Sequence, residues 1–382
     1  MKIRVDLNLS SCDNSYDILI ESGILKNCIN AAERRRNGNC SFEYEETAGI
    51  LKSAGLKGRT FIITSETVNG LYGKDISAFL KEYGVKEEAI FVLPDGEKTK
   101  SLEYLSRIYD RLIEKKLERS DFIVAFGGGV IGDLAGFAAA TYLRGIKFIQ
   151  VPTTLLADVD SSVGGKTGID HHAGKNLIGA FYQPKAVIID VDLLKTLDKR
   201  ELINGFAEVI KYGAVLDAEL FAYLETNYEK IISFDKDSLI HIIQKSCSIK
   251  AAIVKEDEKE EGVRSVLNFG HSLGHAVEAL YNYEGIKHGE AISIGMIFAA
   301  KLSKKLGLCF EDTVSKVKNL IKNSGLPADI PKFSPEQYLN AMKLDKKVNE
   351  RQIKFVLIKE IGKFEFKKLD FDFIHDFLNE TI

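Results

Sequence analysis

Short apolar runs alternate with helix-length segments through the first half of the chain. The runs are rich in Ile, Val and Phe and are nearly apolar throughout, which is the pattern of strands covered on both faces. This alternation predicts a parallel α/β sheet, preceded by a hairpin. The expected hairpin strands are Ile3–Leu9 and Tyr16–Glu21. The later strands are expected at Thr60–Thr64, Ala89–Leu93, Asp121–Phe126, Lys147–Val151 and Ala186–Asp190, with helical segments such as Ile76–Tyr83 and Leu102–Lys116 between them.

The apolar spacing becomes helical after Asp190. Ala291–Leu306, for example, has the spacing of a helix that Gly307 ends. Only Ile353–Leu357 again has the composition of a strand. Because 382 residues correspond to about two domains, we expect an α/β domain over residues 1–190 and an α-helical domain over residues 191–382.

Composition narrows the class of protein. Apolar residues make up 45% and charged residues 28% of the chain, which excludes a mainly disordered protein. The formal net charge of −3 gives no basic field for nucleic acid. The five cysteines form no C-x-x-C pair, the first residues have no apolar signal segment, and no apolar run approaches ~20 residues. We therefore expect a cytoplasmic protein that binds neither nucleic acid nor membrane.

A glycine motif follows one of the predicted strands and opens a helix. Gly127, Gly129 and Gly132 fit G-x-G-x-x-G, in which glycines let the backbone approach a pyrophosphate at a helix N-terminus. The alternative is a tight strand–helix turn that binds nothing. No acidic residue ends the next strand, Lys147–Val151, where the ribose-binding acid usually lies, so a nucleotide would be held in another way.

A polar segment at the end of the predicted sheet combines glycines, hydroxyl groups, lysines and an asparagine. It contains Asp160, Lys166, Lys175 and Asn176. Lysine charges together with backbone amides suit a phosphorylated substrate. A generic polar loop is the alternative, because the segment lacks the upstream glycine of a Walker A motif.

Two further groups of residues have the chemistry of a site. Glu201, Glu208 and Lys211 can share one helical face, either as functional groups or as a row of surface ion pairs. Three of the seven histidines fall within 18 residues, at positions 271, 275 and 288. Two imidazoles and a carboxylate with an open position make a catalytic zinc site. The spacing favours His271 with His275, and leaves open His271 with His288, with His275 as an acid or base.

Taken together and in this order, these motifs resemble the 3-dehydroquinate synthase family over about residues 95 to 300. The matching segments are GGGVIGDLAGF (127–137), TYLRGI (141–146), VPTTLLADVDSSVGGKTGID (151–170), GKNLIGAFYQP (174–184), FAEVIKYG (206–213), NFGHSLGHAVE (268–278) and HGEAISIGM (288–296). The resemblance implies a Rossmann-like parallel-sheet N-terminal domain, an all-α C-terminal domain and a homodimer. It also implies NAD and a divalent metal, zinc or cobalt, held by Glu208, His271 and His288, with His275 beside the substrate.

The resemblance also implies residue roles. Glu66, where the family often has Asp, would approach the adenosine ribose. The other NAD contacts would be Asp95, Gly96, Glu97, Lys98, Lys100, Gly128, Gly129, Val130, Asp133, Thr153, Thr154, Leu193 and Thr196. The substrate contacts would be Asp160, Lys166, Lys175, Asn176, Lys211, Lys250, Arg264, Asn268, His275 and Lys347, with Arg144 from the partner subunit.

The implied reaction converts 3-deoxy-D-arabino-heptulosonate 7-phosphate to 3-dehydroquinate and phosphate in the shikimate pathway of aromatic amino acid biosynthesis. NAD would be reduced and regenerated in each turnover, around β-elimination of phosphate, before an aldol step closes the ring. One alternative is a metal-dependent polyol dehydrogenase, but such an enzyme does not need lysines for a substrate phosphate and carboxylate. Another is a related cyclase making an inosose or valiolone, whose substrate has no carboxylate and needs no cations to bind one. Lys250 and Arg264 therefore favour the dehydroquinate reaction, and a non-catalytic nucleotide-binding protein would not need Glu208, His271 and His288.

Overall fold

The computed structural model describes residues 1–7, 14–26, 42–55, 58–172, 174–343, 348–349 and 352–382. Contacts divide the chain into two compact units, of which the first contains Met1–Leu197 and Leu239–Lys259 and the second the remainder. Whereas the sequence predicted one boundary near residue 190, this division lies after Leu197. Much of helix α8 (Lys236–Glu256) also belongs to the first unit, where Cys247 and Lys250 hydrogen-bond to residues 158 and 160.

The first unit is built on a seven-stranded sheet with the order β1-β2-β9-β6-β5-β3-β4. Its strands are β1 (Lys2–Val5), β2 (Tyr16–Glu21), β3 (Arg59–Ser65), β4 (Lys86–Leu93), β5 (Phe122–Gly127), β6 (Lys147–Pro152) and β9 (Ala186–Asp190). β1 runs antiparallel to β2, and all other neighbours are parallel. The predicted α/β sheet is confirmed, and each predicted strand from Thr60–Thr64 to Ala186–Asp190 overlaps an observed one.

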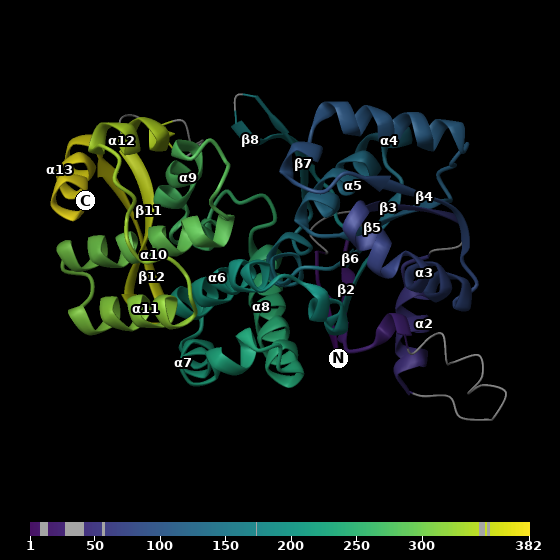
Figure 1. The fold of residues 1–382 in the computed structure, drawn as a ribbon, viewed down its shortest axis with the longest axis horizontal. Helices are drawn as coiled ribbons and strands as arrows, with labels where there is room; N and C mark the ends of the chain where they lie inside the picture. The colour runs from purple at the N-terminus through teal and green to yellow at the C-terminus, as the bar shows by residue number, and fades with distance from the viewer. Residues whose placement is uncertain (8–13, 27–41, 56–57, 173, 344–347, 350–351) are drawn as a thin grey trace. The chain divides into compact units, whose positions relative to one another are not determined.

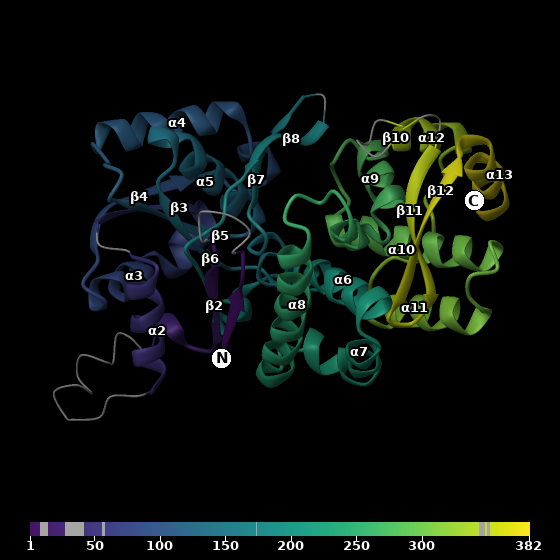
Figure 2. The same ribbon diagram turned by 180° about the vertical axis from the view of Figure 1, so that it is seen from behind.

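Helices cover both faces of this sheet, which explains why its strands are apolar throughout. The helices are α2 (Phe42–Ser53), α3 (Glu66–Glu82), α4 (Leu102–Glu114) and α5 (Gly129–Thr141). Ile62 and Val124 face a core shared with α2 and α3, whereas Ile63 and Ile123, one residue away in their strands, face α4 and α5. Figures 1 and 2 show α4 and α5 together on one side of the strands and α3 on the other.

The strand order reverses between β3 and β5. The chain passes outward from β3 to β4, returns to β5 on the other side of β3, and then continues through β6 to β9. In open α/β sheets, ligands bind at the carboxyl ends of the strands where the order reverses. At this point Glu66 follows β3 and Gly128 follows β5.

An antiparallel hairpin that the sequence did not predict carries part of the polar segment. It consists of β7 (Lys166–His171) and β8 (Gly174–Phe181). A Cβ atom on Gly179 would lie 2.2 Å from the Thr167 carbonyl oxygen, so the strands approach closely only with glycine there. The composition of a polar loop concealed this pairing, because β8 is largely exposed.

The second unit is mainly helical. Its helices are α6 (Lys199–Leu216), α7 (Ala218–Ile232), α9 (His271–Leu280), α10 (His288–Lys305), α11 (Glu311–Asn323), α12 (Pro335–Lys343) and α13 (Phe371–Thr381), with the short η5 (Val263–Asn268). It also contains a small antiparallel sheet of β10 (Val348–Asn349), β11 (Gln352–Glu360) and β12 (Lys363–Asp370). The predicted strand Ile353–Leu357 lies in β11, and its apolar side packs against α9 and α10 (Figure 2). The sequence did not predict β12, whose alternation is weakened by lysines.

Glycines bring α6, α9 and α10 into backbone contact. A Cβ atom on Gly295 of α10 would lie 1.8 Å from the Gly270 carbonyl oxygen, immediately before α9. A Cβ atom on Gly289 of α10 would lie 2.0 Å from the Asn204 carbonyl oxygen of α6. The three helices therefore pack at a distance that no larger residue at positions 289 and 295 permits.

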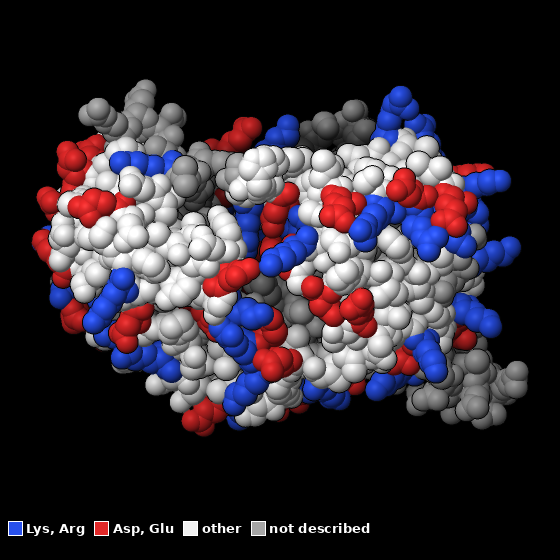
Figure 3. All heavy atoms as spheres, turned by 45° about the horizontal axis from the view of Figure 1, so that its top comes forward, with Lys and Arg blue, Asp and Glu red and all other residues white. Residues whose placement is uncertain are grey.

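The surface carries both signs of charge. Basic and acidic side chains are interspersed on the face drawn in Figure 3. Within the described ranges, no helix is long and apolar enough to span a membrane.

Substitution of Gly295 tests this helix packing. We expect Gly295→Ala to lower the free energy of unfolding by about 1–3 kcal/mol or more, because the added methyl group would overlap the backbone of the neighbouring helix. Gly70→Ala is the matched control, since Gly70 lies in α3 with open space around its Cβ position. The control should be neutral or stabilising by up to about 1 kcal/mol, the helix-propensity gain of alanine. Urea unfolding measures both, and equal stability of the two variants would contradict the packing.

Candidate active site

Three helices of the second unit place a carboxylate and two imidazoles together. Glu208 of α6, His271 of α9 and His288 of α10 offer ligand atoms that lie within 4.8 Å of one another. The Glu208 Oε1 atom is 3.2 Å from Nε2 of His288 and 3.5 Å from Nε2 of His271. The Glu208 side chain is completely buried. One carboxylate oxygen and two Nε2 atoms thus point to a common position.

The other nitrogen of each imidazole has its own partner. Nδ1 of His271 lies 3.2 Å from the Phe269 carbonyl oxygen, and Nδ1 of His288 lies 3.3 Å from Oε2 of Glu278. A proton on each Nδ1 would satisfy these acceptors and leave both Nε2 lone pairs directed at Glu208. Metal-binding histidines commonly have such partners, which fix the tautomer and the orientation of the ring.

The electrostatics of this cluster favour a cation. Burial alone would raise the pKa of Glu208, but the adjacent Lys211 ammonium and the two histidines hold it well below its usual range. Burial lowers the pKa of His271 to about 4, so this imidazole is neutral. Burial opposes protonation of His288 too, but Glu278 and Glu208 raise its pKa to about 10. A positive charge is therefore stabilised between two carboxylates, and the donors fit a divalent metal such as zinc or cobalt.

His275 lies outside this set. It is half-buried one helical turn beyond His271, with the two ring centroids 5.3 Å apart. Its potential ligand neighbours are Glu278 and His288, not Glu208. The helical spacing favoured His271 with His275 as the histidine pair, but His275 is not in the three-residue group that contains Glu208. His288, from the next helix, takes that place.

Several residues expected to contact a dinucleotide gather at the carboxyl ends of the parallel strands. Glu66 is the first residue of α3 and is exposed. Asp95, after β4, accepts hydrogen bonds from the amide and hydroxyl of Thr67 at 3.1 and 2.7 Å. Burial acts to raise the pKa of Asp95, but hydrogen bonds from Ser65 and Thr67 lower it. The carboxylate is thereby held charged at this end of the sheet.

The glycine turn after β5 leaves a helix N-terminus accessible. Gly128 caps α5 without a side chain, so the first-turn amides are left for another acceptor. A Cβ atom at Gly128 would lie 3.1 Å from Cγ2 of Thr154, which brings this turn close to the expected contacts after β6. The remaining expected contacts lie on η1 (Glu97–Thr99), on α5, and on η4 (Val191–Thr196), or directly beside these elements and β6: Gly96, Glu97, Lys98, Gly129, Val130, Thr153, Leu193 and Thr196.

Lys100 joins the expected cofactor and substrate residues within the first unit. Its buried ammonium donates to Oδ2 of Asp133 and to Oδ1 of Asn176, each at 2.5 Å. Burial raises the pKa of Asp133 despite the opposing charge of Lys100. Asp170 completes the network, because its Oδ1 atom accepts a hydrogen bond from the backbone amide of Asn176 at 2.8 Å. Helix α5 and the hairpin are thus tied to one lysine, which the sequence placed only in the cofactor set.

The other expected substrate residues of the first unit lie in three places. Lys250 of α8 is buried and donates to the carbonyl oxygen and to Oδ1 of Asp160, both at 2.7 Å. Lys175 lies 3.9 Å from the Glu97 carboxylate, and Lys166 is exposed at the start of β7. Arg144 is exposed on a turn, η2 (Tyr142–Arg144).

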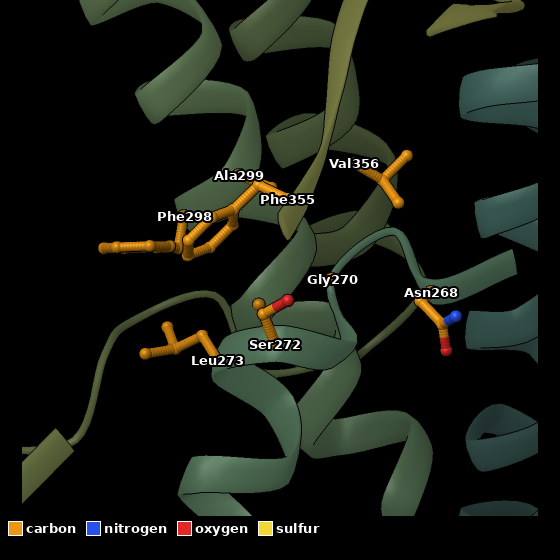
Figure 4. Close-up of a pocket in the computed structure, with 9 residues that line it drawn as sticks. Asn268, Gly270, Ser272, Leu273, Phe298, Ala299, Phe355 and Val356 are labelled. Atoms are coloured by element: carbon orange, nitrogen blue, oxygen red, sulfur yellow. The ribbon is translucent and has the colours of Figure 1, made fainter. Parts of the chain in front are cut away.

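In the second unit, Lys211 and Arg264 are almost completely buried. Asn268 donates to Oε1 of Glu260 at 2.5 Å and lines a small pocket with Phe298 and Phe355 (Figure 4). This pocket is mainly apolar and none of the three residues of the Glu208 cluster lines it. Lys347 lies outside the described residues.

Glu278 was not among the site residues expected from the sequence. Its position three residues after His275 and seven after His271 places it on the same face of α9, and this spacing was the available signal. The partner of Nδ1 of His271 is a backbone carbonyl, for which a sequence gives no signal.

Comparisons with known proteins place this architecture in a family. The chain matches the 3-dehydroquinate synthase N-terminal model over residues 90–204 and the 3-dehydroquinate synthase C-terminal model over residues 205–348. It is 46% identical to a 3-dehydroquinate synthase of Citrifermentans bemidjiense over 96% of this chain and 95% of that protein.

Two solved structures resemble the whole chain. One is a 2-epi-5-epi-valiolone synthase from Streptomyces hygroscopicus subsp. jinggangensis with NAD+ and Zn2+ bound (26% identity, TM-score 0.84, 98% of each chain). The other is a 2-deoxy-scyllo-inosose synthase complexed with carbaglucose-6-phosphate, NAD+ and Co2+ (25% identity, TM-score 0.83, 100% of each chain). From the two consecutive family matches and the identity over almost the full length, we conclude that the chain belongs to the 3-dehydroquinate synthase family.

Proposed function

We propose that this protein is a 3-dehydroquinate synthase, a lyase that converts 3-deoxy-D-arabino-heptulosonate 7-phosphate to 3-dehydroquinate and phosphate. The observation that carries the proposal is the buried Glu208 carboxylate facing the Nε2 atoms of His271 and His288, in a chain of this family. The reaction would belong to aromatic amino acid biosynthesis.

Each proposed cofactor has a matching set of residues. Glu208, His271 and His288 would hold zinc or cobalt, and residues around Glu66, Asp95 and Gly128 would hold NAD. When bound, the metal supplies Lewis acidity and NAD supplies a reversible hydride acceptor. The chain itself supplies alignment. Glu278 and the Phe269 carbonyl orient the imidazoles, and Lys211 keeps Glu208 ionised.

The charged side chains suit a substrate with both a phosphate and a carboxylate. Lys166, Lys175 and Asn176 would position the phosphate, with His275. Buried Arg264 and Lys250 would bind the remaining polar groups, the carboxylate among them. Asp160 fixes the Lys250 ammonium through hydrogen bonds at its carboxylate and carbonyl oxygens. For β-elimination, these groups would have to hold the phosphate leaving group in a fixed position relative to the C–H proton that is removed. Their role is therefore one of positioning.

We also propose that the active form is a homodimer in a reducing cytoplasm, to which Arg144 contributes across the interface. Hairpin β7–β8 exposes Leu177, Ile178 and Phe181, and the Tyr182 hydroxyl that follows it donates to the Ile146 carbonyl oxygen beside the Arg144 turn. An apolar surface next to a presented arginine suits a second copy of this chain. Cys247 and Cys309 are free buried thiols, as a reducing compartment allows.

The proposed activity predicts phosphate release with catalytic use of NAD. Purified protein with metal, substrate and NAD+ far below the substrate concentration should release many phosphates per NAD+. A chelator should abolish the release, because the metal is required. Accumulation of NADH on simple polyols, with no phosphate released from the sugar phosphate, would contradict the proposal and favour a dehydrogenase. Phosphate release without a carbocyclic acid product would favour a related cyclase.

Glu208→Gln tests the proposed metal ligands. Loss of the buried charge should lower metal content after dialysis to near zero and the rate by at least about 100-fold, the scale of a lost electrostatic stabiliser. Glu201→Gln is the matched control on the same helix, since Glu201 pairs with Lys287 at the surface. The control should retain its metal and most of its rate. Stoichiometric metal in the dialysed Glu208→Gln variant would contradict the assignment.

Phe181→Asp tests the proposed dimer. A charge on the exposed hairpin should shift the protein toward monomers in light scattering and reduce the rate as Arg144 is withdrawn from the partner. Phe310→Asp is the control, because Phe310 is 86% exposed at the start of α11, elsewhere in the chain. A monomeric wild type with full activity would refute the dimer, and a fully dimeric Phe181→Asp variant would refute the hairpin as its interface.

A further inference from the structure

One face of α9 carries three metal-binding side chains. His271, His275 and Glu278 stand at positions i, i+4 and i+7, which fall on the same side of a helix. His288 lies opposite this row, with its ring centroid 5.3 Å from that of His271 and 6.1 Å from that of His275. The His288 imidazole is therefore shared by two groups of donors.

The two nitrogens of His288 face different carboxylates. Nε2 lies 3.2 Å from Oε1 of Glu208, and Nδ1 lies 3.3 Å from Oε2 of Glu278. His275, Glu278 and His288 form a second group, whose ligand atoms also all lie within 4.8 Å of one another. Both groups thus present two imidazoles and one carboxylate, the donor chemistry that zinc and cobalt prefer.

We infer that His275, Glu278 and His288 form a second, weaker divalent-cation site, which fills when metal is in excess. Small side-chain rotations would bring its donors to about 2.0–2.2 Å from the ion. The cation would replace the proton between Nδ1 of His288 and Glu278, and that proton passes to solvent. This inference rests on the proposed function, in that the first metal binds on the Nε2 side.

The two sites differ in solvent access and in the hydrogen bond that is lost when metal binds. Glu208 is completely buried and Glu278 is 5% exposed, so the carboxylates do not differ much in access. His275 is half-buried, whereas His271 of the first group is buried, so solvent ions reach the second site more readily. Filling it removes Glu278 as the hydrogen-bond partner that orients His288, and losing such a partner typically lowers metal affinity about 10- to 100-fold. It also withdraws His275 from its proposed contact with substrate, so excess metal should inhibit.

The test counts metal ions without using activity. Metal-free protein is titrated with Co2+ and followed by visible absorption and calorimetry. Wild type should bind two equivalents, the second at least about 10-fold more weakly. His275→Asn should bind only the tight equivalent. His375→Asn is the matched control and should bind two, because His375 is a partly exposed histidine of α13 that lies 3.0 Å from Glu336. If His275→Asn does not fold, Glu278→Gln replaces it with the same expectation.

The outcomes separate this inference from the proposed function. A single equivalent in wild type would overturn the second site and leave the proposed metal site standing. A second equivalent that survives in His275→Asn or Glu278→Gln would overturn it too. No Co2+ binding by wild type would overturn both.

Discussion

The functional cluster depends on backbone contact between helices, made possible by glycine. Gly295 of α10 lies against the Gly270 carbonyl before α9, and Gly289 of α10 lies against the Asn204 carbonyl of α6. Gly289 also donates from its amide to Oδ1 of Asn204. Because α10 begins at His288 and α9 begins at His271, these contacts set the distance between the two imidazoles. A larger side chain at either glycine would separate the donors that the cluster requires.

Burial gives this cluster its electrostatic character. An isolated buried carboxylate would take up a proton, and Glu208 stays ionised because Lys211 and the histidines surround it. A buried ion pair adds little to stability, and removing one of its partners is costly. The arrangement is therefore better explained as preparation for a cation than as a device for stability. Hydrogen bonds from outside the cluster complete this preparation by fixing both rings.

The sequence predicted the sheet well because both faces of it are covered. Runs such as Asp121–Phe126 are apolar almost throughout, and such runs leave few alternatives to a buried strand. The β7–β8 hairpin was missed because exposed polar strands look like loops, and β12 was missed because lysines interrupt its alternation. Both segments become strands because they pair with a neighbouring strand, and local composition does not indicate such pairing.

For the site, the sequence indicated the chemistry better than the geometry. Three clustered histidines indicated a metal, but helical spacing favoured His271 with His275. Only the resemblance implied Glu208 together with His288, which come from other helices. Lys100 shows the same limit, since its contacts with Asp133 and Asn176 join segments 33 and 76 residues away. Contacts between segments far apart in the chain follow from packing, which no local motif encodes.

The most direct measurement is the position of the metal by anomalous X-ray diffraction from crystals grown with one equivalent of Co2+ or Zn2+. We expect one anomalous peak at about 2.0–2.2 Å from Nε2 of His271, Nε2 of His288 and a carboxylate oxygen of Glu208. A peak coordinated by His271 and His275 without Glu208 would contradict it, as would no peak near these residues.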